Sequence, residues 1–323
     1  MIISVIVPAY NAAATLAECL AALHKQSRAP DEIIVVDDGS TDRTAELARA
    51  SGARVLQQPN RGPAAARNLG VQNARGDLIL FTDADCAPAP DWVAQMLAPF
   101  ADAGISGAKG VYRTRQKSWT ARFAQAEYED KYDRMRRYAT IDFIDTYSAA
   151  YRRAVYLAND GMDPSFPRAS GEDVEFSYRL AQRGFKLVML PSAVVYHNHP
   201  ATLFKYLRRK FFVGYWRVRM YEKHPAKIKG DAHTPLALKI QMGLGLVFVG
   251  AALLSIVWRD AIIGGALALG ALGLTTIPFA IKTFARDRAI ALLAPGFLFL
   301  RAFALDAGFV LGLLQRAWQR IRG

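Results

Sequence analysis

The sequence predicts an α/β domain with a mostly parallel sheet flanked by helices, followed by an interfacial helix and transmembrane helices. Three observations lead to this prediction. Short apolar runs alternate with helix-forming patterns over the first 113 residues, as in sheets covered by helices. Two later stretches, 19 and 21 residues long, contain no charged side chain. The excess of positive charge is confined to the second part of the chain.

Charge divides the 323 residues into two parts. Residues 1–200 contain 23 Lys and Arg and 23 Asp and Glu, whereas residues 201–323 contain 18 and 5 and carry the whole net charge of +13. This division argues against a small single domain, a disordered chain and a uniformly basic nucleic-acid-binding protein. The two cysteines, Cys19 and Cys86, exclude a disulfide scaffold and indicate a reducing, cytosolic setting. The N-terminus is typical of a first strand and lacks the pattern of a signal peptide.

Apolar periodicity predicts the elements of the first part. Strands are expected at Ser4–Val7, Glu32–Val36, Arg54–Leu56 and Leu78–Phe81. Helices are expected at Thr15–Leu23, Thr41–Ala50 and Pro63–Ala74. A long amphipathic helix within residues 114–146, a helix at Gly171–Arg183 and a strand at Lys186–Tyr196 follow. Because the alternation implies parallel strands with helices on both faces, ligands should bind beyond the carboxyl ends of the strands.

The second part contains two stretches that can cross a bilayer. Residues 240–258 and 261–281 lack charges, and at about 1.5 Å per residue each helix would be about 30 Å long. A turn at Trp258–Asp260 would join them into a hairpin. The basic segment 282–288 should then be cytoplasmic, because positive charge favours that side of a membrane.

The last apolar stretch, residues 289–314, allows several arrangements. It contains Pro295, Arg301 and Asp306. If it spans the membrane, the basic tail lies outside, against the charge rule; if it re-enters, protein must cover its irregular backbone. Charges within a membrane segment indicate function by default. The alternative is an interfacial helix, or side chains that extend to the headgroups.

The segment before the hairpin, residues 201–235, is expected at the membrane interface. Within it, Thr202–Glu222 carries one apolar, aromatic-rich stripe and has lysines and arginines on its other faces. This composition suits anionic lipid; the alternative is a soluble helix packed on the first domain. Nucleic-acid binding is not favoured, because no recognised motif accompanies the charge. The expected organisation is a domain at 1–200, this segment and a transmembrane region at 236–323.

Carboxylates follow two of the predicted strands. Asp83 and Asp85 come directly after an apolar strand and form a hard oxygen site suited to Mg²⁺ or Mn²⁺, with a solvated turn as the alternative. Asp37 and Asp38 can accept hydrogen bonds from a ribose or a base. The alternative is a turn before a capped helix, but capping uses serine or threonine and does not account for these two aspartates.

Three further groups are candidate functional residues. Arg67 lies about one turn into a helix that begins with small residues, and it can pair either with a diphosphate or with one of the aspartates named above. Glu172 and Asp173 open a helix, whose dipole favours negative charge; one of them can instead be a general base. His197 and His199 follow the last strand and are candidates for an extra metal or diphosphate contact.

Five short motifs occur in order along the chain. They are Val5–Asn11, Asp37–Asp42, Ala65–Asn68, Asp83–Asp85 and Gly171–Asp173. Together they resemble the family 2 inverting glycosyltransferases, which use nucleotide-diphosphate sugars on a GT-A fold, and the resemblance covers roughly residues 1–200. The run Gly161–Asp163 is similar to the acceptor-side loop of that family.

The resemblance implies a role for each matching residue. On the donor side it implies contacts to the base by Pro8, Ala9, Tyr10 and Asp38 and to the ribose by Asp83. It places Arg67 near the nucleotide or the diphosphate. It implies Asp85 as the ligand of Mg²⁺ or Mn²⁺, and His197 is an additional candidate. On the acceptor side it implies Gly161, Met162, Asp163 and Gly171. Asp173 would be the general base of a single displacement with inversion, with Glu172 beside it.

The implied protein is a multi-pass enzyme of the inner, cytoplasmic membrane with its catalytic domain on the cytoplasmic side. It would transfer a sugar from a UDP- or GDP-sugar to a lipid or lipid-linked glycan. The Gln-x-x-Arg-Trp motif of processive synthases is absent at Leu207–Phe211, and Cys86–Pro90 replaces the Gln-His-Pro-like run of polyprenyl-phosphate sugar synthases. A short processive synthase and a non-catalytic membrane scaffold remain as alternatives. The sugar, the acceptor and the oligomeric state do not follow from the sequence.

Overall fold

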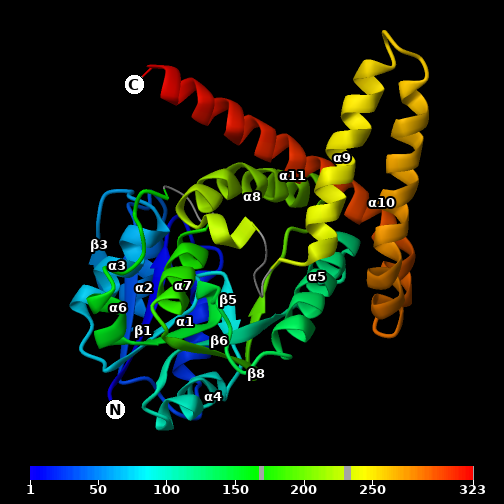
Figure 1. The fold of residues 1–323 in the computed structure, drawn as a ribbon. Coiled ribbons are helices and arrows are strands. Elements are labelled where there is room, and N and C mark those ends of the chain that lie inside the picture. Colours follow the sequence, from blue (N-terminus) through cyan, green and yellow to red (C-terminus); the bar gives the residue numbers. More distant parts are fainter. Residues whose placement is uncertain (167–170, 229–233, 323) are drawn as a thin grey trace. The chain divides into compact units, whose positions relative to one another are not determined.

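The computed structural model describes residues 1–166, 171–228 and 234–322 (Figure 1). The chain forms two units. The first unit comprises residues 1–115 and 132–198, and the second comprises residues 116–131 together with those from 199 onward. The second boundary falls near the one expected at residue 200, whereas residues 116–131, expected in the first domain, group with the C-terminal helices.

An eight-stranded mixed sheet forms the centre of the first unit, in the order β3-β2-β1-β4-β7-β6-β8-β5 among the described residues. The strands are β1 Ile3–Ala9, β2 Glu32–Asp37, β3 Arg54–Gln57, β4 Leu78–Phe81, β5 Cys86–Pro88, β6 Ile105–Arg113, β7 Ala149–Arg152 and β8 Lys186–His197. β1 to β4 pair in parallel, as predicted. β7 is antiparallel to β4 and β6, and β5 is antiparallel to β8. The predicted α/β class is confirmed.

Helices of the first unit connect these strands. They are α1 Leu16–His24, α2 Thr44–Ala50, α3 Pro63–Asn73, α4 Trp92–Leu97, α6 Arg153–Ala158 and α7 Glu172–Gln182. α3 begins with proline directly after Gly62, whose φ of +88° suits glycine. Gly70 of the same helix lies against Ile6 of β1 and Val36 of β2, where a Cβ atom would collide with Ile6. This close contact packs the body of α3 directly against β1 and β2.

The second unit is helical. It contains most of α5 (Trp119–Met135) and α8 Leu203–Lys223, α9 Leu236–Leu254, α10 Ala261–Phe284 and α11 Arg288–Arg322. Three of these helices are long and apolar enough to cross a membrane: Leu236–Leu254, Ala261–Phe284 and residues 288–319 of α11. α9 and α10 lie side by side as a hairpin (Figure 1). α9 begins and ends four residues earlier than the predicted span 240–258, because the turn to α10 occupies Ser255–Asp260.

The ambiguous stretch 289–314 is part of one continuous helix. α11 runs through Pro295 without a break, so it lacks the internal turn that a re-entrant segment needs. Arg301 and Asp306 of α11 are both buried in the second unit, in contrast to side chains that extend to the headgroups. The carboxylate oxygens of Asp306 have no hydrogen-bond partner among the described residues, and Asp306 lies against Gly245 of α9, where a Cβ atom would collide with it.

A buried ionic network holds α5, α8, α9 and α11 together. Glu127 of α5 accepts hydrogen bonds from Arg301 at 2.7 Å and from the Tyr206 hydroxyl at 2.8 Å, and it lies 2.9 Å from the Lys210 ammonium. Arg301 also donates to the Gln241 side chain at 2.5 Å. Burial alone would raise the pKa of Glu127, but Lys210 and Arg301 lower it to about 2. The carboxylate therefore stays charged and ties four helices to one point.

Glycine allows α8 and α11 to touch along their backbones. A Cβ atom at Gly308 of α11 would collide with the carbonyl oxygen of Phe211 and lie 2.9 Å from the Tyr215 nitrogen, both in α8. We expect Gly308→Ala to destabilise the second unit by about 1–3 kcal/mol, because backbone atoms cannot rotate aside. Gly296→Ala is the matched control, since a Cβ atom there meets nothing within 4 Å. Equal thermal unfolding of the two variants in detergent would contradict this packing.

Candidate active site

The carboxyl ends of three adjacent parallel strands carry the predicted donor-side residues. β1 ends in Pro8 and Ala9, followed by Tyr10, and β1 pairs in register with β2 so that Ala9 lies opposite Asp37. Ala9 is buried, whereas the Tyr10 side chain is exposed and can reach a ligand. β4 lies on the other side of β1 and is followed by Asp83. The order β2-β1-β4 therefore places these residues at one edge of the sheet.

The two aspartates at the carboxyl end of β2 anchor the neighbouring loops. Asp38 is buried, and its carboxylate accepts hydrogen bonds from the backbone nitrogens of Arg61 at 2.9 Å and Gly62 at 2.8 Å, and from the Gln58 side chain at 2.6 Å. Asp37 accepts from the Ser40 backbone nitrogen at 3.0 Å. Asp38 thus holds the start of α3, and its contact to the base stays a prediction.

Arg67 joins two of the predicted site carboxylates. Its guanidinium donates to Asp83 at 2.7 Å and to Glu172 at 3.0 Å. Arg67 and Glu172 are buried, while the Asp83 side chain is 30% exposed. Burial alone would lower the pKa of Arg67, but Asp83 and Glu172, with Asp173, raise it above its ordinary range. The expected alternative, a salt bridge to Asp83, is therefore present, and the diphosphate contact of Arg67 stays a prediction.

The first turn of α7 separates two adjacent acids. Gly171 precedes the helix with φ of +140°, a conformation that favours glycine. Glu172 is buried and bonded to Arg67, so it is occupied inside the protein. Asp173 is half-buried, and one of its oxygens accepts the Val174 backbone N–H at 2.9 Å. Of the two, Asp173 is the carboxylate that a substrate hydroxyl can approach.

The predicted acceptor-side loop is fixed to α3 by Asn68. The Asn68 side chain donates to the Met162 carbonyl at 2.7 Å and accepts from the Met162 nitrogen at 3.0 Å. Gly161 has φ of +61° and lies so close to Asn68 that a Cβ atom would collide with the amide oxygen. Arg179 of α7 also donates to the Gly161 carbonyl at 2.8 Å. Asp163 follows Met162, and its carboxylate accepts the Ser165 N–H at 2.8 Å.

Asp85, Cys86 and His197 bring three metal-binding atom types together. The His197 Nδ1 lies 3.5 Å from Asp85 Oδ1, and the Cys86 Sγ lies 3.7 Å from each of these atoms. The three residues line a cavity of about 170 Å³ in the first unit. The donor set fits a divalent cation. Cys86 was missed in the sequence, because its distance of 111 residues from His197 hides the contact; His199 instead lies in the second unit, 3.0 Å from Gln125.

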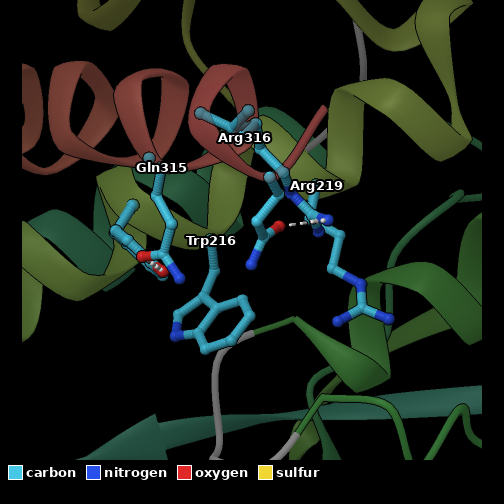
Figure 2. A pocket seen from close by; sticks show the side chains of 8 residues that line it. Trp216, Arg219, Gln315 and Arg316 are labelled. Carbon is cyan, nitrogen blue, oxygen red and sulfur yellow. Dashed lines mark hydrogen bonds between the residues drawn. The ribbon is translucent and has the colours of Figure 1, made fainter. Parts of the chain in front are cut away.

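A cavity of about 120 Å³ lies between α8 and α11 in the second unit. Figure 2 shows Trp216 and Arg219 from α8 and Gln315 and Arg316 from α11 around it. The Arg316 guanidinium lies 3.5 Å from Glu222. Aromatic and cationic side chains thus line a hollow next to a helix that can span a membrane.

Solved structures with the same fold define the class of this protein. A mannosyltransferase from Pyrobaculum calidifontis, in complex with GDP-Man and Mn²⁺, aligns with a TM-score of 0.63 at 22% identity over 96% of this chain and 86% of that chain. The glucosyl-3-phosphoglycerate synthase of Mycobacterium tuberculosis, with Mn²⁺ and UDP-Glc, aligns with a TM-score of 0.50 at 21% identity over 69% and 78%. The fold is that of GT-A glycosyltransferases.

Sequence comparison then gives the family of the first part of the chain. Residues 4–157 match the model of glycosyl transferase family 2, so this part is a family 2 glycosyltransferase domain. The chain is 27% identical to the glycosyltransferase AglE of Haloferax volcanii over 68% of this chain and 74% of that protein. It is 27% identical to the pre-mycofactocin glycosyltransferase of Mycobacterium tuberculosis over 75% of this chain. It is 30% identical to an N-acetylglucosaminyltransferase of Azorhizobium caulinodans over 64% of this chain. The chain spans only 54% and 57% of these last two relatives.

Proposed function

We propose that this chain is a membrane-anchored, inverting glycosyltransferase that moves a sugar from a UDP- or GDP-sugar to a hydroxyl of a lipid or lipid-linked acceptor. The observation that carries the proposal is the Arg67 bridge. It joins Asp83, next to the metal-binding group, to Glu172, next to the accessible Asp173. Donor-side and acceptor-side carboxylates thereby belong to one rigid network.

The donor side is supported by the ligands of the structural neighbours. Those proteins hold GDP-Man or UDP-Glc together with Mn²⁺. In this chain Tyr10 is exposed and would contact the base, and the partly exposed Asp83 would contact the ribose. Asp85 and His197 would hold Mg²⁺ or Mn²⁺, and such a cation offsets charge on a leaving nucleoside diphosphate.

On the acceptor side, we assign the proton transfer to Asp173. Its carboxylate takes the proton of the acceptor hydroxyl, and the oxygen attacks the anomeric carbon on the face opposite the diphosphate. The new glycosidic bond forms as the bond to the diphosphate oxygen breaks, so the configuration inverts. Glu172 and Arg67 position this group, because Glu172 fixes the start of α7 and its charge is balanced by Arg67.

The membrane assignment draws on the second unit. Three helices can span a bilayer, α8 carries basic side chains, and Arg219 and Arg316 line the cavity of Figure 2. Basic residues such as these are attracted to the headgroups of anionic lipids. We place the protein in the inner membrane as a multi-pass enzyme with the first unit in the cytoplasm, where nucleotide sugars and a basic segment at 282–288 would both lie.

Product analysis tests the proposal. Purified protein would be incubated with UDP- and GDP-sugars, a divalent cation and a membrane lipid extract, and the product examined by mass spectrometry and NMR. One added sugar on a lipid, with inverted anomeric configuration, is expected. Retained configuration or a water-soluble acceptor would contradict it, and a long polymer would favour the processive alternative. A scaffold would show neither transfer nor metal-dependent nucleotide binding.

Asp85→Ala should remove the metal dependence of nucleotide binding. We expect the affinity for UDP or GDP at saturating Mn²⁺ to fall at least about tenfold, because a bound metal stabilises phosphate charge by several kcal/mol. Calorimetric titration with and without Mn²⁺ measures this. Asp91→Ala is the control, since Asp91 is an exposed carboxylate close by in the sequence. Metal-stimulated binding that is equal in the Asp85 variant and the wild type would exclude Asp85 as a ligand.

A further inference from the structure

We infer that Cys86 is a third protein ligand of the metal site, and that the site therefore takes a borderline cation such as Zn²⁺ in preference to Mg²⁺ or Mn²⁺. The inference deepens the proposed function, since it concerns the metal of the donor site. Asp85 and His197 alone would make an oxygen and nitrogen site. The sulfur of Cys86 changes the chemical class of ion that the three residues prefer.

The spacing of the three donor atoms is the first argument. Asp85 Oδ1, His197 Nδ1 and Cys86 Sγ form a triangle with sides of 3.5, 3.7 and 3.7 Å. Zinc bonds of about 2.0–2.3 Å at tetrahedral angles separate neighbouring ligand atoms by about 3.4–3.6 Å. Octahedral Mg²⁺ with bonds of about 2.1 Å separates them by only about 3.0 Å. The triangle is therefore closer to the separations of a tetrahedral cation than to those of octahedral Mg²⁺.

Preorganisation is the second argument. Cys86 of β5 and His197 of β8 lie directly opposite each other in the antiparallel pair, so the ladder itself places sulfur and imidazole together. The His197 ring stacks on Tyr112 with centroids 4.5 Å apart, which fixes the plane of the imidazole. Both residues are buried, whereas the Asp85 side chain is 46% exposed. Two ligands are thus rigid, and the third lies where a phosphate can enter.

The chemistry of the donor set is the third argument. Thiolate and imidazole select Zn²⁺ and similar cations, whereas carboxylate and water suit Mg²⁺ and Mn²⁺. Three protein ligands also leave one coordination position open, as in catalytic zinc sites. That position would belong to an oxygen of the donor diphosphate. A hydrogen-bonded cluster without metal affinity is the competing account of the same triangle.

Cobalt(II) binding tests the inference without any transfer reaction. Full-length protein in detergent, with no nucleotide present, would be titrated with Co²⁺. We expect a near-ultraviolet thiolate-to-cobalt charge-transfer band and the intense visible bands of tetrahedral cobalt. Zn²⁺ should abolish both bands at concentrations at which Mn²⁺ does not. Absence of the thiolate band in the wild type, or its loss to Mn²⁺ as readily as to Zn²⁺, would overturn the inference.

The two cysteines of the chain provide matched variants. Cys19 is also buried and lines the same cavity, so Cys19→Ser should keep the band and Cys86→Ser should lose it. Loss of a group that only hydrogen-bonds to a metal ligand costs metal affinity about 10- to 100-fold, so loss of a direct ligand should weaken Zn²⁺ binding at least about 100-fold. If Cys86→Ser does not fold, the Cys19→Ser variant still tests the inference. Cys86 is then the only cysteine of the chain, so any thiolate band must come from it. A band lost in Cys19→Ser would overturn the inference, whereas transfer activity reports separately on the proposed function.

Discussion

Asp173→Asn should reduce the rate of sugar transfer by about 10²- to 10⁴-fold, because a positioned general base contributes rate acceleration of that size. Asparagine keeps the shape of the side chain and still accepts the Val174 N–H seen at 2.9 Å. It cannot take the proton of the acceptor hydroxyl. The measurement is the initial rate of transfer at saturating donor and acceptor, so that a change in binding does not enter.

Donor binding distinguishes a catalytic loss from a structural one. Asp173 lies on the acceptor side of the Arg67 bridge, so we expect the Asn variant to bind UDP or GDP with Mn²⁺ as the wild type does. Asp160→Asn is the control, since Asp160 is exposed and its φ of +62° is one that asparagine tolerates. A transfer rate within tenfold of the wild type in the Asp173 variant would exclude it as the base.

The parallel strands could be predicted from sequence because their signals are local. β1, β2 and β4 are short apolar runs with proline or aspartate at or within two residues of their ends, and all four side chains of β4 are buried. β5 has only three residues and includes a proline, so periodicity has nothing to detect. β6 contains glycines and Lys109, which sequence rules place at the surface. In the fold Lys109 is fully buried against Asp145, and this pairing spans 36 residues.

Prediction of the site from the sequence was likewise limited to local signals. Each strand-end motif was visible because it occupies a few consecutive residues. The salt bridge of Arg67 to Asp83 was among the expected alternatives, but the more distant partners were not visible, since Arg67 meets Glu172 across 105 residues and Asn68 meets Met162 across 94. Such contacts depend on where α3 and α7 begin relative to the sheet, and this is set by Gly62 and Gly171 at positive φ. Glycine before a helix marks such a start, but it does not identify the partner.

The apolar helices of the second unit were predicted in outline, and the contacts among them were not. Length and lack of charge identify a spanning helix, so the two hairpin helices were found to within a few residues. The role of Arg301 could not be predicted, because its ionic partner lies outside the apolar segment that contains it. Glu127, which lies in α5, neutralises it, and an amphipathic helix more than 170 residues earlier gave no sign of this contact. Residues 116–131 were accordingly expected in the first domain.

Arg67→Met should destabilise the first unit by about 3–5 kcal/mol, because removal of one partner leaves buried charge uncompensated. Glu172 is buried and Asp83 is partly buried, and both lose their guanidinium hydrogen bonds in this variant. Methionine fills much of the same volume, so the effect reports charge more than packing. For a unit of this size the melting temperature should fall by on the order of 10 °C. Thermal unfolding of the full chain in detergent measures it.

Two further variants separate the charge effect from general damage. Arg61→Met is the control, because Arg61 is exposed and contributes only its backbone N–H to Asp38. In the double variant Arg67→Met, Glu172→Gln the buried charge is removed together with its partner, so part of the lost stability should return. Since neighbouring carboxylates hold the pKa of Arg67 above its ordinary range, the guanidinium of the wild type stays charged at neutral pH. If the double variant is as unstable as the sum of the two single changes, Arg67 acts by packing, and the network that joins donor and acceptor sides is not held by charge.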